Sequence, residues 1–385
     1  MLVVAEYYPR AGDPVGGVWA HRQAVAARAA GAEVRVLVLH RPIPPLSSVS
    51  SGQIRRGAAV VGQPRRTKLD GVEVEYVRYL SPPRPWSYGS WGAWAAPLLS
   101  RAIERVRASF PFDVIHAHYA VPAGDAVRRV APEAPLVVSV HGHDVQGAGA
   151  GSANVRATLA HARLVLANSA GTARRSAALG AGRTRVVHLG ADVPSVPASR
   201  PRTPTLVTVA HLAPRKRHAD VICALAVLRR RHPTLRYMIV GDGPERGRLQ
   251  SLAASLGVAH QVQISGQLPN DRATEQARAG WLFVMPSIDE AFGVAYVEAM
   301  GGGVPAIGCR GEDGPEEIAA AGGGIELVAP LYVRGLAERI DRLLADPAAL
   351  AALGAAARQT VKRSFTWDRC GADTVAAYQE ALAGR

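Results

Sequence analysis

The 385-residue sequence has few cysteines and no long hydrophobic run. Cys223, Cys309 and Cys370 lie far apart and form no Cys-x-x-Cys pair, so we expect reduced cysteines and no zinc site. No stretch approaches the roughly 18 apolar residues of a membrane-spanning helix. The first five residues read as a short apolar strand with no basic segment before it, so we expect no secretory signal and a cytoplasmic protein.

Lysine is also scarce, so arginine carries nearly all of the formal net charge of +14. This enrichment has two interpretations: genomic base composition, or contact with an anionic membrane surface or anionic substrates such as nucleotide sugars. A role in binding nucleic acid is disfavoured because no basic and aromatic recognition motif occurs.

Two domains are expected because the chain is too long for one ordinary core. Short apolar strands, beginning at residues 2–5, alternate with helical stretches as in a parallel sheet covered on both faces. Prolines and small polar residues at 193–204 resemble a linker, and the same alternation then restarts. We predict an α/β protein with domains at 1–196 and 197–364 and a final amphipathic helix over 365–385.

Glycine-containing loops follow predicted strands in both halves. Gly16 and Gly17 lie between the first strand and the first helix, where backbone N–H groups can approach a phosphate or a sugar. Gly241 and Gly243 follow a strand of the second half, at the sheet edge where ligands of open α/β domains bind. Ordinary turns would use all four glycines as readily.

Three adjacent cations, Arg215, Lys216 and Arg217, precede a predicted helix in the second half. Cations at a helix start oppose the helix dipole, so we expect an anion such as a pyrophosphate to offset that cost. A solvated basic face is the alternative interpretation.

Histidines cluster at strand ends of the first half. His141 ends a strand in the sequence His-Gly-His-Asp, and its imidazole together with the Asp144 carboxylate could handle a proton or a sugar hydroxyl. A lone histidine is more often structural. His116 and His118 share one face of an earlier strand, and we favour packing over metal binding because no third ligand lies at a plausible spacing.

Two glutamates, Glu290 and Glu298, lie eight residues apart where a strand passes into a helix that the glycines at 301–303 end. We expect both acids on one face of that helix start. Taken alone, the pair suggests acid and base hydrolysis.

In order, these motifs resemble the retaining glycosyltransferases of family 4. The resemblance covers nearly the whole chain and includes "VSVHGHDV", "HLAPRKR" and "VGDGPERGRLQSLAASLGV". Its most specific part, "PSIDEAFGVAYVEAMGGGVPAIG", is similar to the paired-glutamate motif of the family. The resemblance implies the GT-B fold: two facing Rossmann-like domains with an interdomain cleft, and a final helix that returns to the N-terminal, acceptor-binding domain.

The resemblance also implies residue roles. Glu290 would contact hydroxyls of the donor sugar, Glu298 would hold the ribose, and Lys216 with Arg215 would neutralise the diphosphate. His141 would approach the transferred sugar, so His141, Glu290 and Lys216 are the catalytic candidates. The remaining donor-binding candidates are Gly16, Gly17, Gly241, Gly243, Phe292, Gly293 and Val294. The family usually has arginine in place of His211 and glycine in place of Arg217.

The implied reaction moves a hexose-type sugar from a UDP- or GDP-sugar to an acceptor hydroxyl with retention of configuration. It would use a front-face mechanism in which the leaving phosphate oxygen accepts the proton of the acceptor. No Asp-x-Asp motif ends a predicted strand, so we expect neither a metal nor a cofactor. A catalytically silent sugar-binding protein of the same fold is the alternative, and an epimerase or hydrolase of similar architecture is disfavoured by the paired glutamates.

Acceptor recognition is expected in the first half. Trp86, Trp91 and Trp94 lie within nine residues and precede an arginine-rich helix. They could stack on sugars or lie at a lipid interface, and core packing is the alternative. The acceptor-site candidates are Trp86, Trp91, His118 and Asp144. The acceptor would be a glycan, a lipid-linked molecule or a small metabolite, and the basic first domain could contact the anionic inner face of the membrane.

Overall fold

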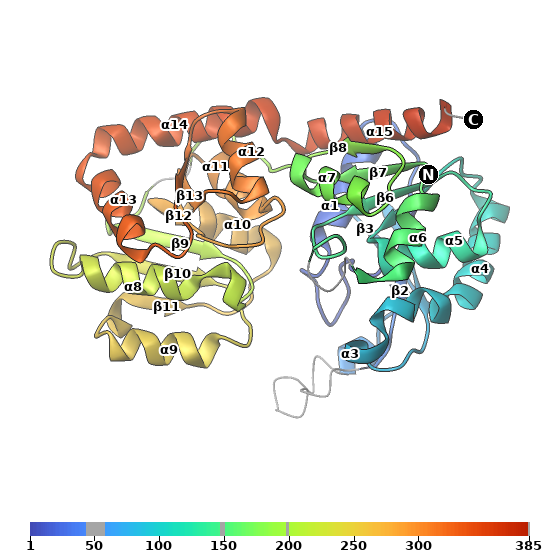
Figure 1. Ribbon diagram of the computed structural model, residues 1–385, viewed down its shortest axis with the longest axis horizontal. Helices are drawn as coiled ribbons and strands as arrows, with labels where there is room; N and C mark the ends of the chain where they lie inside the picture. The colour runs from blue at the N-terminus through green and yellow to red at the C-terminus, as the bar shows by residue number, and fades with distance from the viewer. Residues whose placement is uncertain (44–57, 147–150, 198–199, 384–385) are drawn as a thin grey trace. The chain divides into compact units, whose positions relative to one another are not determined.

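The computed structural model describes residues 1–385 except 44–57, 147–150, 198–199 and 384–385, and except the side chains of 85–86 (Figure 1). The chain divides into two units. Unit 1 comprises Met1–Leu189 together with Trp367–Arg385, and unit 2 comprises Gly190–Thr366.

Unit 1 is built on a sheet with the strand order β3-β4-β2-β1-β5-β6-β7-β8. Its strands are β1 (Leu2–Ala5), β2 (Arg35–His40), β3 (Arg66–Leu69), β4 (Val72–Arg78), β5 (Ile115–His118), β6 (Leu136–Val140), β7 (Leu164–Ala167) and β8 (Thr184–Val186). Neighbouring strands pair in parallel, except that β3 runs antiparallel to β4 at the sheet edge. Every residue of β1, β5, β6 and β7 is buried, as expected for parallel strands with both faces covered.

The helices of unit 1 cover this sheet. They are α1 (Val18–Ala29), α3 (Arg84–Ser87), α4 (Trp91–Ser109), α5 (Asp125–Val130), α6 (Ala153–His161), α7 (Ala170–Ala178) and α15 (Trp367–Ala383). Helix α15, at the end of the chain, packs beside α1 near its beginning (Figure 1). Within this packing Gln23 donates a buried hydrogen bond of 3.0 Å to the Thr374 hydroxyl.

Unit 2 contains a sheet with the strand order β11-β10-β9-β12-β13-β14, in which neighbours pair in parallel. Its strands are β9 (Thr205–Val209), β10 (Arg236–Val240), β11 (Val262–Ile264), β12 (Leu282–Val284), β13 (Ala306–Cys309) and β14 (Ile325–Val328). Its helices are α8 (His218–Leu228), α9 (Arg246–Ser255), α10 (Asn270–Arg278), α11 (Val294–Gly301), α12 (Asp313–Ala321), α13 (Val333–Ala345) and α14 (Pro347–Ser364).

The predicted boundary at 196/197 differs from that of the structure, because residues 190–196 belong to unit 2. Ala191 pairs with Thr366 as an isolated bridge, and its N–H donates to the Phe365 carbonyl at 2.8 Å. The two crossings between units therefore lie side by side at the edge of unit 2. The second lies between Thr366 and Trp367, two residues after the predicted 364/365 boundary.

In each sheet the strand order reverses at one point, so that strands earlier in the chain extend the sheet to one side and later strands extend it to the other. In unit 1 this switch point lies between β1 and β5, and in unit 2 between β9 and β12. The loops that leave the carboxyl ends of two such strands diverge and leave a crevice, which is where open α/β sheets bind ligands. Within the described residues, no helix is long and apolar enough to cross a membrane.

Candidate functional site

The switch point of unit 2 brings together two charged residues predicted from the sequence. Lys216 ends a short 3-10 turn, Pro214–Lys216, after β9, and Glu290 lies in the loop after β12. The Lys216 ammonium donates to Glu290 Oε2 at 2.5 Å. The Arg215 guanidinium lies 3.9 Å from the same oxygen. Two motifs 74 residues apart in sequence therefore form one site.

This ion pair is buried, since the side chains of Lys216 and Glu290 are only 12% and 8% exposed. Burial alone would raise the pKa of Glu290, but Lys216, Arg215 and a hydrogen bond from Ser287 together lower it below its usual value. Burial lowers the pKa of Lys216, and Glu290 offsets only part of that effect. We conclude that Glu290 is ionised and that Lys216 holds it so.

Hydrogen bonds to neighbouring loops fix the backbone around Glu290. Its N–H donates to Glu312 Oε2 at 2.7 Å, and its carbonyl accepts from the Gly314 N–H at 3.3 Å. The Ser287 hydroxyl donates to Glu290 Oε2 at 2.9 Å. A further bond of 2.9 Å runs from the Ile288 N–H to the Arg215 carbonyl and ties the two charged loops together. Ser287 and Glu312 were not predicted as site residues, although Glu312 lies just after β13, which indicates this edge of the sheet.

The paired glutamates do not share a helix. Glu290 precedes Gly293, the N-terminal cap of α11, whereas Glu298 lies inside that helix and is half-buried. The expectation that both lie on one helix start is therefore wrong, because the chain needs a loop from 285 to 293 to pass from β12 into α11. Phe292 is buried and packs against Phe365, with ring centroids 5.7 Å apart. Val294 is the first residue of α11.

Only two of the three adjacent cations reach Glu290. Arg217 adopts a left-handed conformation with φ of 57° and forms two hydrogen bonds to the Asp220 carboxylate, of 2.9 and 2.7 Å. Glycine adopts this left-handed conformation without strain, so the backbone here fits the glycine that the resemblance implies. Asp220 in the first turn of α8 thus offsets one of the charges for which we expected an external anion.

The glycines after β10 allow close packing of this loop against the loop after β9. A Cβ atom at Gly241, whose φ is 147°, would lie 2.0 Å from the Ala210 carbonyl oxygen. At Gly243 it would lie 2.6 Å from the Leu212 carbonyl oxygen. These two glycines therefore set the path of the loop that leads to Lys216.

In unit 1 the predicted histidines form one cluster, which we call the histidine cluster: His116, His118 and His141. His118 Nδ1 lies 3.1 Å from His141 Nε2, and the two rings stack at 5.3 Å. His116 bonds to the Tyr378 hydroxyl at 2.8 Å and to the Ser139 hydroxyl at 2.7 Å. The cluster thus anchors α15, and His116 has the packing role expected from the sequence.

The histidine cluster is uncharged. Burial lowers the pKa of His116 and of His141 to about 3, and it lowers that of His118 well below the usual value. His118 Nε2 is buried without a hydrogen-bond partner in the described part of the chain. A proton on His118 Nδ1 leaves only a lone pair unpaired there, so this tautomer is favoured. His141 then accepts at Nε2 and carries its proton on Nδ1.

Asp144 holds the loop that carries His141. Its carboxylate accepts from the His141 N–H at 3.0 Å and from the Ala120 N–H at 3.2 Å. Burial raises the pKa of Asp144 to about 6 despite these bonds. Asp144 therefore positions the ends of β5 and β6 relative to each other, and it does not pair with the His141 ring.

The glycine loop after β1 forms the start of α1. Gly17 caps the helix with φ of 75°, and a Cβ atom there would lie 2.1 Å from the Tyr7 backbone. The Gly16 N–H donates to Asp13 Oδ1 at 3.0 Å. Gly17 is therefore required by the turn itself, whatever else the loop binds.

The predicted tryptophans have different environments. Trp91 is only 5% exposed, contacts Tyr79 and Tyr88, and donates from Nε1 to the Ser87 hydroxyl at 3.0 Å. It therefore packs in the core of unit 1, and the expectation that it contacts an acceptor is wrong. Trp86 lies in α3, and its side chain is outside the part of the chain that the structure describes. Trp94 is 52% exposed on α4.

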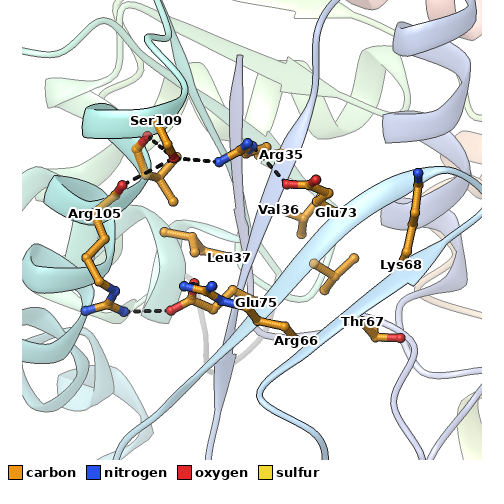
Figure 2. Close-up of a pocket in the computed structure, with 12 residues that line it drawn as sticks. Arg35, Val36, Leu37, Arg66, Thr67, Lys68, Glu73, Glu75, Arg105 and Ser109 are labelled. Carbon is orange, nitrogen blue, oxygen red and sulfur yellow. Dashed lines mark hydrogen bonds and ion pairs between the residues drawn. The ribbon is translucent and has the colours of Figure 1, made fainter.

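A cavity of about 420 Å³ lies elsewhere in unit 1, against β2, β3, β4 and α4 (Figure 2). Apart from Lys68, its charged groups pair with one another: Glu75 contacts Arg66 at 3.1 Å and Arg105 at 2.6 Å, and Arg35 contacts Glu73 at 3.1 Å. Its lining includes Arg35 and Glu73, which lie near the amino ends of β2 and β4, at the opposite end of these strands from the carboxyl edge. We therefore do not assign it to the functional site.

Metal ligands do not gather in the described ranges: no group of three or more His, Cys, Asp or Glu side chains there could hold a metal ion. Cys309 and Cys370 are buried free thiols, as expected, and Cys223 is half-buried.

Family models match both halves of the chain. The model described as Glycosyltransferase Family 4 matches residues 16–194, and the model described as Glycosyl transferases group 1 matches residues 193–360. The junction between the two matches lies close to the boundary between the units.

Two curated relatives are similar to this chain. A D-inositol 3-phosphate glycosyltransferase 1 from Catenulispora acidiphila is 30% identical over 366 residues, covering 82% of this chain and 82% of that protein. A GDP-mannose-dependent α-(1-6)-phosphatidylinositol monomannoside mannosyltransferase from Mycolicibacterium smegmatis is 33% identical over 189 residues. The latter match spans 47% of this chain and about half, 48%, of the mannosyltransferase.

Solved structures share the fold over nearly the full length. A sucrose-phosphate synthase from Thermosynechococcus elongatus has a TM-score of 0.79 at 19% identity, covering 100% of this chain and 99% of that one. HepE from Anabaena, in complex with UDP and glucose, has a TM-score of 0.72 at 20% identity, covering 98% and 99%. Both likenesses support the GT-B arrangement of two Rossmann-like domains. The chain belongs to glycosyltransferase family 4, with a family 4 domain in its first half and a group 1 domain in its second.

Proposed function

We propose that this glycosyltransferase moves a hexose-type sugar from a nucleoside-diphosphate sugar to an acceptor hydroxyl, with retention of configuration. The observation that carries the proposal is the buried pair of Lys216 and Glu290 at the switch point of unit 2. A switch point is where a nucleotide binds in this kind of sheet. In this proposal the pair would set a cation for the diphosphate beside an anion for sugar hydroxyls.

Lys216 and Arg215 would stabilise the leaving diphosphate. Negative charge develops on the phosphate oxygens as the glycosidic bond breaks, and cations that are already in place stabilise it without reorganisation. The Lys216 ammonium has three hydrogens, of which Glu290 accepts one and Met285 Sδ, at 3.9 Å, weakly accepts a second, so a donor remains for a phosphate. The N-terminus of α11, at Gly293 and Val294, adds backbone N–H groups on the same loop. Because the chain supplies this charge itself, we propose that transfer needs no metal.

Glu290 would bind hydroxyls of the donor sugar and not act as a nucleophile. Lys216, Ser287 and Arg215 all converge on its Oε2. An oxygen so engaged is a poor nucleophile, whereas the other carboxylate oxygen can accept from a sugar hydroxyl. In front-face transfer the leaving phosphate oxygen takes the acceptor proton. The neutral His141 would donate from Nδ1 to the sugar, and Glu298 would hold the ribose.

The donor base would be uridine or guanosine. The mannosyltransferase relative is GDP-mannose-dependent by name, and HepE was solved with UDP. A panel of UDP- and GDP-sugars, each with a set of glycan, lipid and small-metabolite acceptors, tests the proposal by release of nucleoside diphosphate. The anomeric configuration of the product, read by NMR, tests retention, and activity in excess chelator tests metal independence. Tight binding of a sugar nucleotide without any release would instead support a catalytically silent binding protein.

We also propose peripheral contact with anionic membranes through α4. Trp94 and Leu98 are exposed on consecutive turns, at 52% and 38%, and the exposed Arg101 and Arg105 follow on later turns. Exposed aromatic and apolar groups next to arginines suit the interface of an anionic bilayer. Sedimentation with vesicles of anionic and of zwitterionic lipid tests this contact, and equal recovery of protein with both would contradict it.

A further inference from the structure

A set of polar and aromatic side chains lies at the switch point of unit 1 that none of the motifs above includes. Glu6 and Tyr7 directly follow β1, and Tyr119 directly follows β5. The Tyr7 and Tyr119 ring centroids are 5.1 Å apart, and the Tyr119 ring lies 4.9 Å from that of His141. These residues therefore extend the histidine cluster along the carboxyl edge of the sheet, from β6 across β5 to β1.

Glu6 is a buried carboxylate with one oxygen in use. It is 7% exposed, and its Oε2 accepts a hydrogen bond of 2.7 Å from the Tyr88 hydroxyl. Among the described residues, no group donates to Oε1. Burial raises the pKa of Glu6, which shows that its surroundings do not fully compensate the charge. Oε1 is not among the fully buried polar atoms that lack a partner, so this oxygen of a largely buried carboxylate remains open to a donor from outside the protein.

The neighbours of Glu6 hold it in place and offset its charge only in part, because burial raises its pKa by more than the attraction of Arg84 and Arg10 lowers it. The Arg84 guanidinium lies over the Tyr88 ring at 4.1 Å and over the Tyr7 ring at 5.7 Å, and forms no ion pair with Glu6. Tyr88 packs edge-on against the buried Trp91 at 5.1 Å. The hydroxyl that orients Glu6 is therefore anchored in the core of unit 1.

We propose that Glu6, with Tyr7, Tyr88 and Tyr119, binds the ring of a neutral polyhydroxylated acceptor, a sugar or a cyclitol. Glu6 Oε1 accepts hydrogen bonds from ring hydroxyls, and the tyrosine rings contact the apolar C–H faces of the acceptor. A phosphate or carboxylate on that ring is disfavoured, because Glu6 would repel it. That the bound polyol is an acceptor rests on the proposed transferase function.

The decisive variant is Glu6→Gln, which keeps the size of the side chain and an oxygen for Tyr88 but removes the charge. We expect the KM for a polyol acceptor to rise roughly 10- to 100-fold, as for a lost hydrogen bond to a charged group, with little change in the KM for the donor. Tyr88→Phe keeps the ring and removes only the hydroxyl that orients Glu6, so it should raise the acceptor KM by a smaller factor. Glu104→Gln, on the exposed face of α4, is the matched control and should leave both values unchanged.

Binding of myo-inositol, methyl α-D-glucoside and glucose 1-phosphate, measured by saturation-transfer NMR, gives a readout independent of transfer. Neutral rings should bind the wild-type protein and bind Glu6→Gln more weakly. Equal binding to folded wild-type and Glu6→Gln proteins, or tighter binding of the phosphate ester than of the neutral ring, would overturn the proposal. If Glu6→Gln fails to fold, equal binding to wild-type and Tyr88→Phe proteins overturns it.

The two proposals fail separately. Glu6-dependent polyol binding by a protein that releases no nucleoside diphosphate from any sugar nucleotide supports the polyol site and removes the proposed transferase function. Release of nucleoside diphosphate with an acceptor KM that Glu6→Gln leaves unchanged removes the polyol site alone.

Discussion

The two units share a plan of parallel strands with a site at the switch point, yet their sites differ in charge. In unit 2 the site is an ionised pair, Lys216 and Glu290, with Arg215 beside it. In unit 1 it consists of uncharged histidines and tyrosine rings beside the carboxylate of Glu6. The strand order of the sheet determines where a ligand can bind, and the side chains on the loops determine the chemical class of that ligand. A site with two cations suits a diphosphate, and an aromatic one with a carboxylate suits the C–H faces and hydroxyls of a sugar ring.

Removal of the Lys216 charge tests this comparison most strongly. Lys216→Met leaves the Glu290 carboxylate buried without its partner, so we expect the free energy of unfolding of unit 2 to fall by about 3–5 kcal/mol. We also expect kcat/KM for transfer to fall by roughly 100- to 1,000-fold, as for the loss of one preorganised charge. Chemical denaturation and release of nucleoside diphosphate measure the two effects.

A double variant separates stability from catalysis. The double variant Lys216→Met with Glu290→Gln leaves no buried charge without a partner. Most of the lost free energy of unfolding should therefore return, while kcat/KM for transfer stays as low as in Lys216→Met. Lys362→Met, an exposed lysine of α14 in the same unit, is the matched control and should change neither quantity. Full activity of Lys216→Met would remove the diphosphate assignment.

The sequence predicts the sheet of each unit and the strand ends that carry the sites, because buried parallel strands are short apolar runs separated by helices. Lys216, Glu290 and His141 each follow such a strand. The edge strand β3 and its neighbour β4 were not predicted, although the alternation in "VEVEYVR" of β4 is typical of a strand with one exposed face. Periodicity identifies a strand but does not assign its neighbour, so the strand order was not predictable from it.

The partners of the site residues were less predictable than the residues themselves. Glu290 depends on Lys216 and Glu312, and His141 depends on His118; each of these contacts joins different strands. The sequence could not show that Trp91 turns into the core while Trp94, three residues later, faces solvent. Glu6 could have been noted from its place directly after the first strand, but a single carboxylate at a strand end is a weak signal.

Acid should affect unit 1 more than unit 2. A histidine whose pKa is about 3 in the folded protein and 6.5 in the unfolded chain takes up its proton at a higher pH when the chain is unfolded. The free energy of unfolding therefore falls as the pH drops below 6.5. At pH 5 His116 and His141 each cost about 2 kcal/mol, and His118, whose pKa burial also lowers, adds to the loss. The pKa of Asp144, raised to about 6, acts in the opposite direction and offsets roughly the cost of one histidine. The raised pKa of Glu6 acts in the same direction as that of Asp144, and we expect the three histidines to outweigh both, so that unit 1 loses stability at pH 5.

In unit 2 burial lowers the pKa of His218 to about 4, which costs about 2 kcal/mol at pH 5. The lowered pKa of Glu290 contributes stability that is present above its usual value of 4.5 and is lost only at lower pH. Amide hydrogen exchange at pH 7 and pH 5, corrected for intrinsic rates, measures both units in one sample. Equal losses in the two units would show that the histidine cluster is not held neutral.

Glycine substitutions give the smallest expected effects and separate the sites by ligand. Gly241→Ala forces a Cβ against the Ala210 carbonyl and should cost about 1–3 kcal/mol in stability. Because that contact displaces the loop leading to Lys216, the KM for the donor should rise while the KM for the acceptor does not. Gly17→Ala, strained against the Tyr7 backbone beside Glu6, should have the reverse effect on the two KM values.

Gly247→Ala is the control for both substitutions. Gly247 lies inside α9 with no atom within 4 Å of the added Cβ, so alanine should stabilise that helix by about 0.5–1 kcal/mol and leave both KM values unchanged. Thermal unfolding and initial rates at varied donor and acceptor concentrations give all these quantities. If Gly241→Ala and Gly17→Ala raised the same KM, the assignment of one ligand to each unit would be wrong, because Gly241 packs against the loop after β9 and Gly17 lies in the loop after β1.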